Sequence, residues 1–207
     1  MKLLEIQSSV RQAGSISRQL SHEFLKLWQA HHPDAEWRQR DVGTSPPAHP
    51  TAAWTLANYT DPASRTPEMN AVLAESEQLI QELLWADHLL LGVPMYNLSV
   101  PSNFKAYLDN VVRVGRTFAF DREQFTLQGL ATGKKALVIT PSAGNFELDA
   151  PLGRLNFCQP YLQAILEFIG IGNVQFVTVP NQFMPPEIRQ QEIEAALAKL
   201  AALASDW

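Results

Sequence analysis

The sequence predicts an α/β fold in which a doubly wound, five-stranded parallel sheet is flanked by helices. Short apolar segments alternate with amphipathic ones along the chain, as repeated strand–helix units require. Residues 88–93 are almost continuously apolar, as expected of a central parallel strand that is covered on both faces. The 207 residues suffice for a large core, so we expect a single domain over residues 1–207.

The expected elements follow one another in a regular order. Strands are predicted for residues 2–6, 36–42, 88–93, 135–140 and 174–179, and the polar second one is expected at or near an edge. Helices are predicted where apolar side chains recur at helical spacing, for residues 17–31, 67–86, 101–112, 156–168 and 186–204. Thr66 before Pro67 is typical of a helix start, with Thr as N-cap. Residues 43–66 lack periodicity and predict a long loop with a helical turn near Trp54.

The composition argues against several classes of protein. A net charge of -5 without a Lys/Arg run argues against a nucleic-acid binder. The single cysteine, Cys158, allows no internal disulfide, and we expect it to be a small buried residue in a helix. The five histidines show no metal-ligand spacing, so no metal is expected. Residues 3–6 are too short for a signal peptide and no stretch of about 18 apolar residues occurs, which predicts a cytoplasmic protein without a membrane span.

Ligands of doubly wound sheets bind beyond the carboxyl ends of the strands. The loop after the first expected strand, residues 8–18, is rich in serine and runs directly into a helix. The unpaired amides of a helix N-terminus favour an anion, and the hydroxyls of Ser9, Ser15 and Ser17 would add donors to a phosphate. The alternative is that Ser15 or Ser17 only caps the helix. The loop lacks the glycines and the lysine of a nucleotide P-loop, which disfavours ATP.

The loop after the third expected strand is a candidate site for a planar heteroaromatic ring. A proline at each end, at positions 94 and 101, stiffens it because proline fixes its own backbone angle. Between them, Met95 and Leu98 offer an apolar surface, Tyr96 offers an aromatic group, and Asn97 offers both a donor and an acceptor. The alternative is a rigid connector whose side chains only pack.

A set of motifs, in this order, carries a resemblance to a known family. They are Ser8-Ser9 with Gly14-Ser15-Ile16-Ser17, Pro94-Met95-Tyr96-Asn97, Pro101-Ser102-Asn103-Phe104-Lys105-Ala106-Tyr107-Leu108-Asp109, Arg113-Val114-Gly115-Arg116-Thr117-Phe118, and Pro160-Tyr161-Leu162 with Phe168-Ile169-Gly170-Ile171. With them, the chain resembles the bacterial FMN-dependent NADH-azoreductases, which also act as quinone reductases and have a flavodoxin-like fold. The similarity runs nearly end to end and is weakest over residues 43–66.

The resemblance implies FMN as the cofactor and assigns candidate residues to it. The FMN phosphate would be held by Ser9, Ser15, Ile16 and Ser17. The isoalloxazine ring would be held by Met95, Tyr96, Asn97 and Leu98, and its pyrimidine end by Ser142, Ala143 and Gly144. An acceptor pocket would be lined, in the same chain or from a neighbouring subunit, by Phe118, Phe120, Tyr161 and Phe168. The alternative for each of these four is a plain core residue.

The resemblance also implies a reaction. NADH or NADPH would pass a hydride to the flavin N5 and leave, and a quinone or azo compound would then bind in the same place, in a ping-pong mechanism. The protein would need no nucleophile or general base, so no side chain is expected to be catalytic. Its partners would be small aromatic acceptors, and the enzyme would be a homodimer.

The sequence departs from the family at residues 141–144. Relatives usually have an Arg followed by paired glycines, whereas this chain has Pro141-Ser142-Ala143-Gly144. A nearby cation stabilises negative charge on a reduced flavin, so its loss predicts a lower flavin reduction potential than in relatives. The backbone amides of residues 143 and 144 are expected to act in its place.

Other functions on the same fold depend on other residues. A low-molecular-weight tyrosine phosphatase needs a cysteine in the first loop, which has none. An acyl-carrier-protein phosphodiesterase would need a metal-binding carboxylate cluster, and the sequence shows none. A flavodoxin-type electron carrier usually has acidic loops around its flavin, whereas residues 95–102 are uncharged. An FMN-binding module, or a scaffold that no longer binds FMN, is the remaining alternative.

Overall fold

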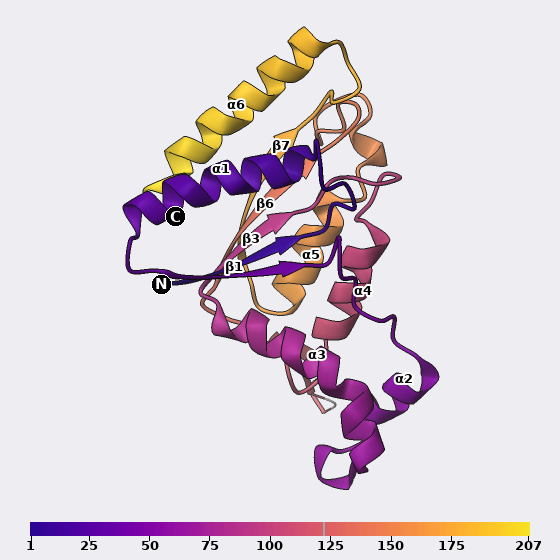
Figure 1. The fold of residues 1–207 in the computed structure, drawn as a ribbon. Coiled ribbons are helices and arrows are strands. Elements are labelled where there is room, and N and C mark those ends of the chain that lie inside the picture. Colours follow the sequence, from indigo (N-terminus) through magenta and orange to yellow (C-terminus); the bar gives the residue numbers. More distant parts are fainter. Residues whose placement is uncertain (122) are drawn as a thin grey trace.

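A computed structural model describes residues 1–121 and 123–207 and contains the predicted five-stranded parallel sheet. The strand order is β2–β1–β3–β6–β7, so the direction of winding reverses between β1 and β3 (Figure 1). The strands are β1 (Lys2–Gln7), β2 (Glu36–Asp41), β3 (His88–Gly92), β6 (Lys135–Pro141) and β7 (Asn173–Val179). The polar strand β2 lies at an edge, as its sequence predicts.

Helices cover both faces of this sheet (Figure 1). One face carries α1 (Ile16–His31) and α6 (Pro186–Ala204), and the other carries α3 (Pro67–Trp85), α4 (Ser102–Val111) and α5 (Gln159–Phe168). Each face has its own apolar core, which explains why every residue of β3 is buried. None of the described helices is long and apolar enough to cross a bilayer.

The helix boundaries follow the sequence closely, with one informative exception. The Thr66 hydroxyl accepts a hydrogen bond from the Met69 amide at 3.3 Å, which confirms the predicted cap of α3. Helix α5 begins three residues later than expected. The Asn156 side chain accepts hydrogen bonds from the amides of Cys158 and Gln159 at 3.1 and 3.0 Å, which holds this segment in a turn before the helix. Cys158 therefore precedes the helix instead of lying in it.

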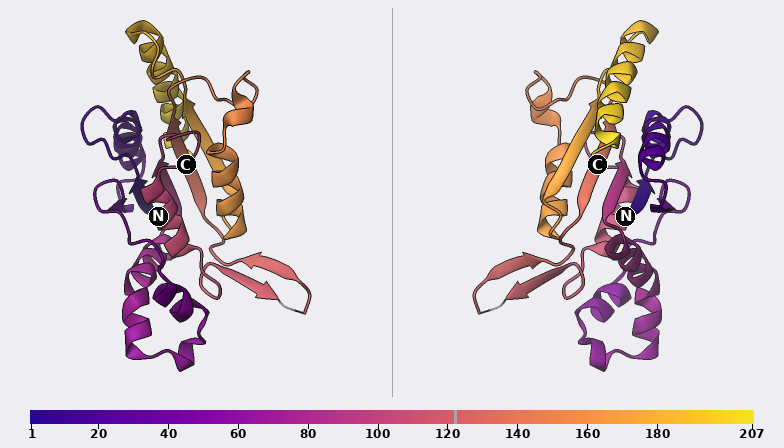
Figure 2. Two further views of the ribbon diagram at one scale, coloured as in Figure 1. Left: turned by 90° about the vertical axis from the view of Figure 1, so that its right-hand side faces the viewer. Right: turned by 90° about the vertical axis from the view of Figure 1, so that its left-hand side faces the viewer.

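A hairpin that the sequence patterns did not predict connects α4 to β6. Its strands are β4 (Phe118–Asp121) and β5 (Thr126–Gly129), and it projects beyond the body of the molecule (Figure 2). Each strand has only four residues, and none of the eight is buried. Period-two alternation is too short there to be recognised, which is why the hairpin was missed.

The segment over residues 43–66 is more ordered than a loop. It contains α2 (Ala52–Tyr59) and a short 3₁₀ helix (Pro62–Ser64), so the helical turn predicted near Trp54 is a helix of eight residues. Arg113, two residues after the end of α4, is only 1% exposed and fixes the segment in place. Its guanidinium donates to the Asn58 side chain at 2.8 Å and to Glu77 of α3 at 2.7 Å.

Candidate functional site

A cavity of about 360 Å³ opens at the carboxyl ends of β1, β3, β6 and β7. This is the place where doubly wound sheets bind ligands. The cavity brings together most of the residues that the sequence proposed for a phosphate and a ring, namely Ser9, Ser15, Ile16, Ser17, Met95, Tyr96, Ser142 and Ala143. Asn97, Leu98 and Gly144 belong to the same loops but do not line this cavity.

The serine-rich first loop presents unused donors to the cavity. Ser15 occupies the N-cap position of α1, but its side chain makes no capping hydrogen bond. Its hydroxyl instead lies 3.2 Å from that of Ser17, and both residues are at least nine-tenths buried. Within the described part of the chain, Ser15 therefore leaves the first-turn amides of α1 uncapped, and no acidic residue occupies that turn. Two buried hydroxyls beside free helix amides fit a phosphate better than they fit the capping alternative.

The backbone of this loop is held by a cation that does not line the cavity. The Arg18 guanidinium donates to the carbonyl oxygens of Ser9 and Arg11 at 2.7 and 3.0 Å. Its other donors form a bidentate pair with Asp41 at 2.7 and 2.8 Å. Burial, the largest single influence, works against ionisation of Asp41. The hydrogen bonds and charge of Arg18, together with the hydrogen bonds from Thr44, outweigh it and lower the pKa of the carboxyl. A methyl group at Gly43 would overlap the Ser9 carbonyl, so the adjoining turn can pass close only as glycine.

The loop after β3, residues 94–101, is called the ring loop below and is built around a tight turn. Tyr96 and Ser99 exchange two backbone hydrogen bonds at 2.9 and 3.0 Å, and the two residues between them have positive φ angles. These are Asn97 at 48° and Leu98 at 71°. A left-handed conformation is unfavourable for leucine, and such strain is commonly found where backbone contacts a ligand. The turn is also fixed from outside, because the Phe157 amide donates to the Leu98 carbonyl at 3.0 Å.

The loop after β7 also lines the cavity, which the sequence interpretation missed. The amides of Gln182 and Phe183 donate to the carbonyls of Ser142 and Ala143 at 3.0 and 2.9 Å. Gln182 and Phe183 consequently join the lining, and the Phe183 ring is 87% exposed. The topology could have predicted this, because in a parallel sheet the carboxyl end of the last strand lies beside those of the other three.

A second cavity of about 470 Å³ shares Tyr96 with the first. It is lined by Tyr96, Asn97, Lys105 and Tyr161 among others, so the structure brings one of the four predicted acceptor-pocket residues to the ring loop. Burial raises the pKa of the Tyr161 phenol, so its hydroxyl stays protonated at neutral pH and remains a hydrogen-bond donor. Lys105 pairs with Asp109 one turn along α4, as its spacing predicts.

The other three predicted acceptor-pocket residues lie elsewhere. The rings of Phe118 and Phe168 pack with centroids 4.8 Å apart, and Phe120 is 42% exposed on the projecting hairpin. Phe168 is the last residue of α5, which begins beside the ring loop. The helix has ten residues and is therefore about 15 Å long. Phe118, Phe120 and Phe168 thus lie towards the amino ends of the strands, whereas the first cavity of the same chain lies at their carboxyl ends.

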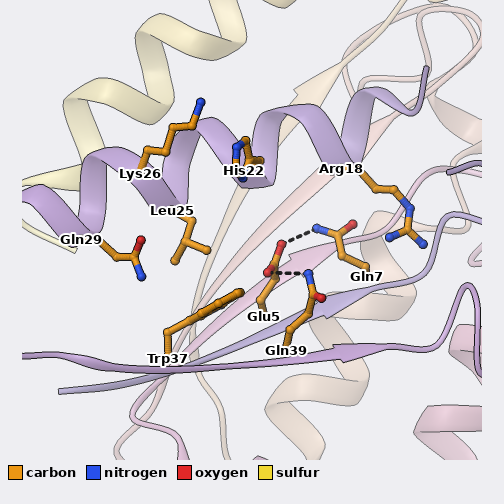
Figure 3. Close-up of a pocket in the computed structure, with 9 residues that line it drawn as sticks. All are labelled: Glu5, Gln7, Arg18, His22, Leu25, Lys26, Gln29, Trp37 and Gln39. Carbon is orange, nitrogen blue, oxygen red and sulfur yellow. Dashed lines mark hydrogen bonds between the residues drawn. The ribbon is translucent and has the colours of Figure 1, made fainter. Parts of the chain in front are cut away.

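A third concavity, a groove of about 250 Å³, lies between α1 and the edge strand β2 (Figure 3). At its floor the buried Glu5 carboxylate accepts hydrogen bonds from Gln7 and Gln39 at 2.8 and 2.9 Å, and Trp37 forms one wall. None of the predicted site residues lines this groove. It exists because α1 and α6 together do not cover the β2 edge of the sheet (Figure 1).

The buried Cys158 is not a reactive thiol in this structure. Burial raises the pKa of the Cys158 thiol to about 12, so the group stays protonated and is a poor nucleophile. Within residues 1–121 and 123–207, no group of three His, Cys, Asp or Glu side chains is arranged to hold a metal ion.

Comparisons with known proteins agree with this geometry. The sequence model of a family described as having a flavodoxin-like fold matches residues 1–204. An FMN-dependent NADH:quinone oxidoreductase from Nostoc punctiforme is 39% identical over 207 residues and all of both chains, and one from Azotobacter vinelandii is 42% identical over 98% of this chain and 99% of its own. The crystal structure of an azoreductase from Bacillus anthracis has the same fold, with a TM-score of 0.91 at 22% identity over 100% of both chains. The chain therefore belongs to the flavodoxin-like family that contains these quinone oxidoreductases.

Proposed function

We propose that the protein is an FMN-dependent NADH:quinone oxidoreductase. The observation that carries the proposal is the first cavity, in which two buried serine hydroxyls and an uncapped helix N-terminus lie opposite the ring loop. Curated relatives that share about two fifths of its residues over nearly their whole length bear this name. The flavin would supply the two-electron chemistry, and the protein would bind and orient it.

The chain's own residues divide the binding between two ends of the cavity. Ser9, Ser15, Ile16 and Ser17 would hold the phosphate through hydroxyl and amide donors. Met95 and Tyr96 would contact the ring, and Asn97 and Leu98 would set the backbone of their turn. The loop over residues 142–144 would face the pyrimidine end, where the Ala143 and Gly144 amides have no acceptor among the described residues. These free donors fit an electron-rich ring edge.

Donor and acceptor would use the same exposed side of the cofactor in turn. The second cavity, with Tyr96 and Tyr161, adjoins the ring loop and is large enough for a small aromatic molecule. We extend the proposal to ping-pong kinetics, to azo compounds as further acceptors, and to NADPH as an alternative donor. The cytoplasmic location inferred from the sequence belongs to the same proposal.

We further propose that the enzyme is a homodimer whose acceptor pocket is completed across the subunit interface. Phe118, Phe120 and Phe168 lie too far from the cavity of their own chain to line it. An acceptor-lining role for them therefore requires a second copy. The projecting hairpin, which exposes Phe120, Phe125 and Leu127, is suited to reach one.

The departure at residues 141–144 predicts a lower flavin reduction potential than in relatives that carry the arginine. In this structure Arg11 is the one cation among the described residues that line the first cavity, and it belongs to the first loop, not to the loop over residues 141–144. Spectroelectrochemistry of the holoprotein measures the potential directly. A value equal to or above that of such a relative would contradict the expectation, and introducing the arginine as Ser142→Arg should raise the potential.

The proposed activity is tested on purified protein loaded with FMN. Flavin absorption near about 370 and 450 nm should bleach on addition of NADH and return on addition of a quinone. Initial rates with both substrates varied should give parallel double-reciprocal lines. A protein that takes up no FMN ends the proposal, whereas one that binds FMN but forms a stable one-electron state supports the electron-carrier alternative.

A further inference from the structure

The groove between α1 and the edge strand β2 is separate from the proposed flavin site (Figure 3). It has a volume of about 250 Å³, and its lining comes from β1, α1 and β2. Among the described residues, none that lines the groove also lines the first or the second cavity. A molecule bound in the groove would therefore be additional to the flavin and to its substrates.

Glu5 places a buried carboxylate without a counter-charge at the floor of this groove. The residue is 3% exposed and forms no salt bridge within residues 1–121 and 123–207. Its two oxygens each accept one hydrogen bond, from the neutral amides of Gln7 and Gln39. A carboxylate oxygen accepts more than one hydrogen bond, and a buried charge is usually paired with an opposite one. Glu5 therefore lacks the partner that its burial calls for.

The two cations that line the groove are engaged elsewhere. All the donating nitrogens of Arg18 are bound to Asp41 and to two carbonyls of the first loop. Lys26 pairs with Glu23, and these side chains are 55% and 41% exposed. The Lys26 ammonium points away from Glu5, towards solvent (Figure 3). Neither cation supplies a direct partner for the carboxylate.

Gln7 adds an acceptor that lacks a donor. The residue is 1% exposed and lines the groove. Its Nε2 donates to Glu5, which fixes the direction of the amide, and its Oε1 accepts no hydrogen bond in the described part of the chain. Leaving a buried acceptor without a donor is unfavourable. A ligand that donates hydrogen bonds at the floor would supply what both Glu5 and Gln7 lack.

Trp37 offers an indole face beside this carboxylate. Two other tryptophans already face a guanidinium, with Arg38 4.0 Å from the Trp85 ring centroid and Arg113 5.8 Å from that of Trp54. Trp37 is 41% exposed, and no Lys or Arg of the described residues lies over its ring. The face of an indole attracts a cation. The wall of the groove and its floor thus favour the same kind of charge.

We propose that the groove binds a small organic cation of the amidinium or guanidinium type. Its planar head donates hydrogen bonds to Glu5, in the geometry that such groups form with a carboxylate. Its apolar body lies against Trp37 and Leu25, which stand on opposite sides of the groove (Figure 3). Pockets for drug-sized molecules begin at about 300 Å³, so this smaller groove limits the body to one ring or a short chain.

Benzamidine is the probe, because it is an amidinium on a single ring, and benzamide is its neutral counterpart of nearly the same shape. Isothermal titration calorimetry is carried out on the protein with and without FMN. Benzamidine should bind with a Kd below about 1 mM in both forms. Benzamide should bind at least about tenfold more weakly, because it lacks the charge that complements Glu5.

Three variants locate the site. Glu5→Gln removes the charge, keeps the shape and should raise the Kd for benzamidine at least about tenfold. Trp37→Leu, at a half-exposed position, should raise the Kd about threefold because the indole face is lost. Glu36→Gln is the matched control. It removes the same charge from the neighbouring exposed residue, whose side chain points to the other face of β2, and should leave the Kd unchanged.

Several outcomes would overturn the inference. They are a Kd for benzamidine above about 1 mM, equal binding of benzamide, and equal effects of Glu5→Gln and Glu36→Gln. A capped Gly-Arg-Gly peptide that binds more tightly than benzamidine would assign the groove to a protein partner instead of a small molecule. Flavin binding plays no part in these measurements. A protein that binds benzamidine but takes up no FMN overturns the proposed function alone.

Discussion

At the scale of single residues, Arg18 shows how a side chain outside the cavity determines its shape. The guanidinium holds two carbonyls of the first loop and is itself held by Asp41. Both partners are mostly buried, with side-chain exposures of 18% and 23%, so solvent screens the pair less than it screens a surface pair. Arg18 is therefore a positioning residue for the candidate phosphate site.

Arg18→Ala should raise the Kd for FMN about tenfold, because the loop amides lose their fixed direction. Arg18→Lys should recover only part of the affinity, since an ammonium cannot bridge two carbonyls and a carboxylate in one plane. Lys26→Ala removes a charge from the exposed side of the same helix and serves as the control. Equal FMN affinity in Arg18→Ala and Lys26→Ala, measured by calorimetry, would refute the positioning role.

His88 is a second residue whose surroundings predict a measurable effect. It is 7% exposed, packs against Trp28 and Trp207, and its Nδ1 has no hydrogen-bond partner among the described residues. Burial lowers the pKa of the imidazole below its ordinary value of 6.5. The unfolded chain therefore binds a proton at His88 more readily than the folded chain does.

The stabilising effect of neutral His88 is fully present above pH 6.5 and is lost as the pH falls below that value. Urea unfolding followed by tryptophan fluorescence should show a falling midpoint between about pH 7 and 5. His88→Phe keeps the aromatic contacts and should flatten this dependence. Asp41 acts in a lower range, because its pKa lies below 3.8 and its contribution is lost only as pH falls through that lowered value. Identical pH profiles for wild type and His88→Phe would disprove the assignment.

At the scale of elements, the β4–β5 hairpin is attached to the body by a close backbone contact. Gly129, at the end of β5, lies against Gly170 just after α5, and a Cβ at Gly129 would overlap the Gly170 nitrogen and Cα. The adjacent Ala131 amide donates to the Ile169 carbonyl at 2.8 Å. Two glycines from distant segments thus set the position of the hairpin.

Gly129→Ala should destabilise the protein by roughly 1–3 kcal/mol, because the backbones must separate to admit the methyl group. Gly172→Ala is the matched control, since nothing lies within 4 Å of the added atom and the backbone there is not left-handed. Its stability should stay within about 0.5 kcal/mol of wild type. The free energies of unfolding from urea titrations decide, and similar losses in the two variants would exclude the close contact as the cause.

At the scale of the whole molecule, the predicted acceptor residues are divided between the carboxyl ends and the amino ends of the strands. Tyr161 lies with the ring loop, whereas Phe118, Phe120 and Phe168 lie with the hairpin. One chain does not bring them together, whereas the proposed dimer would. A hairpin with exposed aromatic side chains is the part that extends furthest from the body on that side (Figure 2).

The chain should therefore sediment as a dimer, and Phe120→Glu should shift it towards the monomer. The same variant should raise the KM for a quinone several-fold, on the order of 1 kcal/mol of lost contact. Leu27→Glu places the same charge at a site of similar exposure on α1, 39% against 42%, and should stay dimeric. A wild-type monomer in analytical ultracentrifugation would contradict the interface.

The sequence by itself determined the sheet, its flanking helices and the two loops of the first cavity. Apolar periodicity is local, and the carboxyl ends of parallel strands must meet at one edge, so Ser15 and Met95 could be brought together by topology alone. Tertiary structure alone decided that Phe183 joins that cavity, that Arg18 holds the first loop, and that Phe168 lies towards the amino ends of the strands. These placements depend on contacts between segments that are distant in sequence. Such contacts depend on side-chain geometry and on how closely two backbones come together, and they leave no periodic pattern in the sequence.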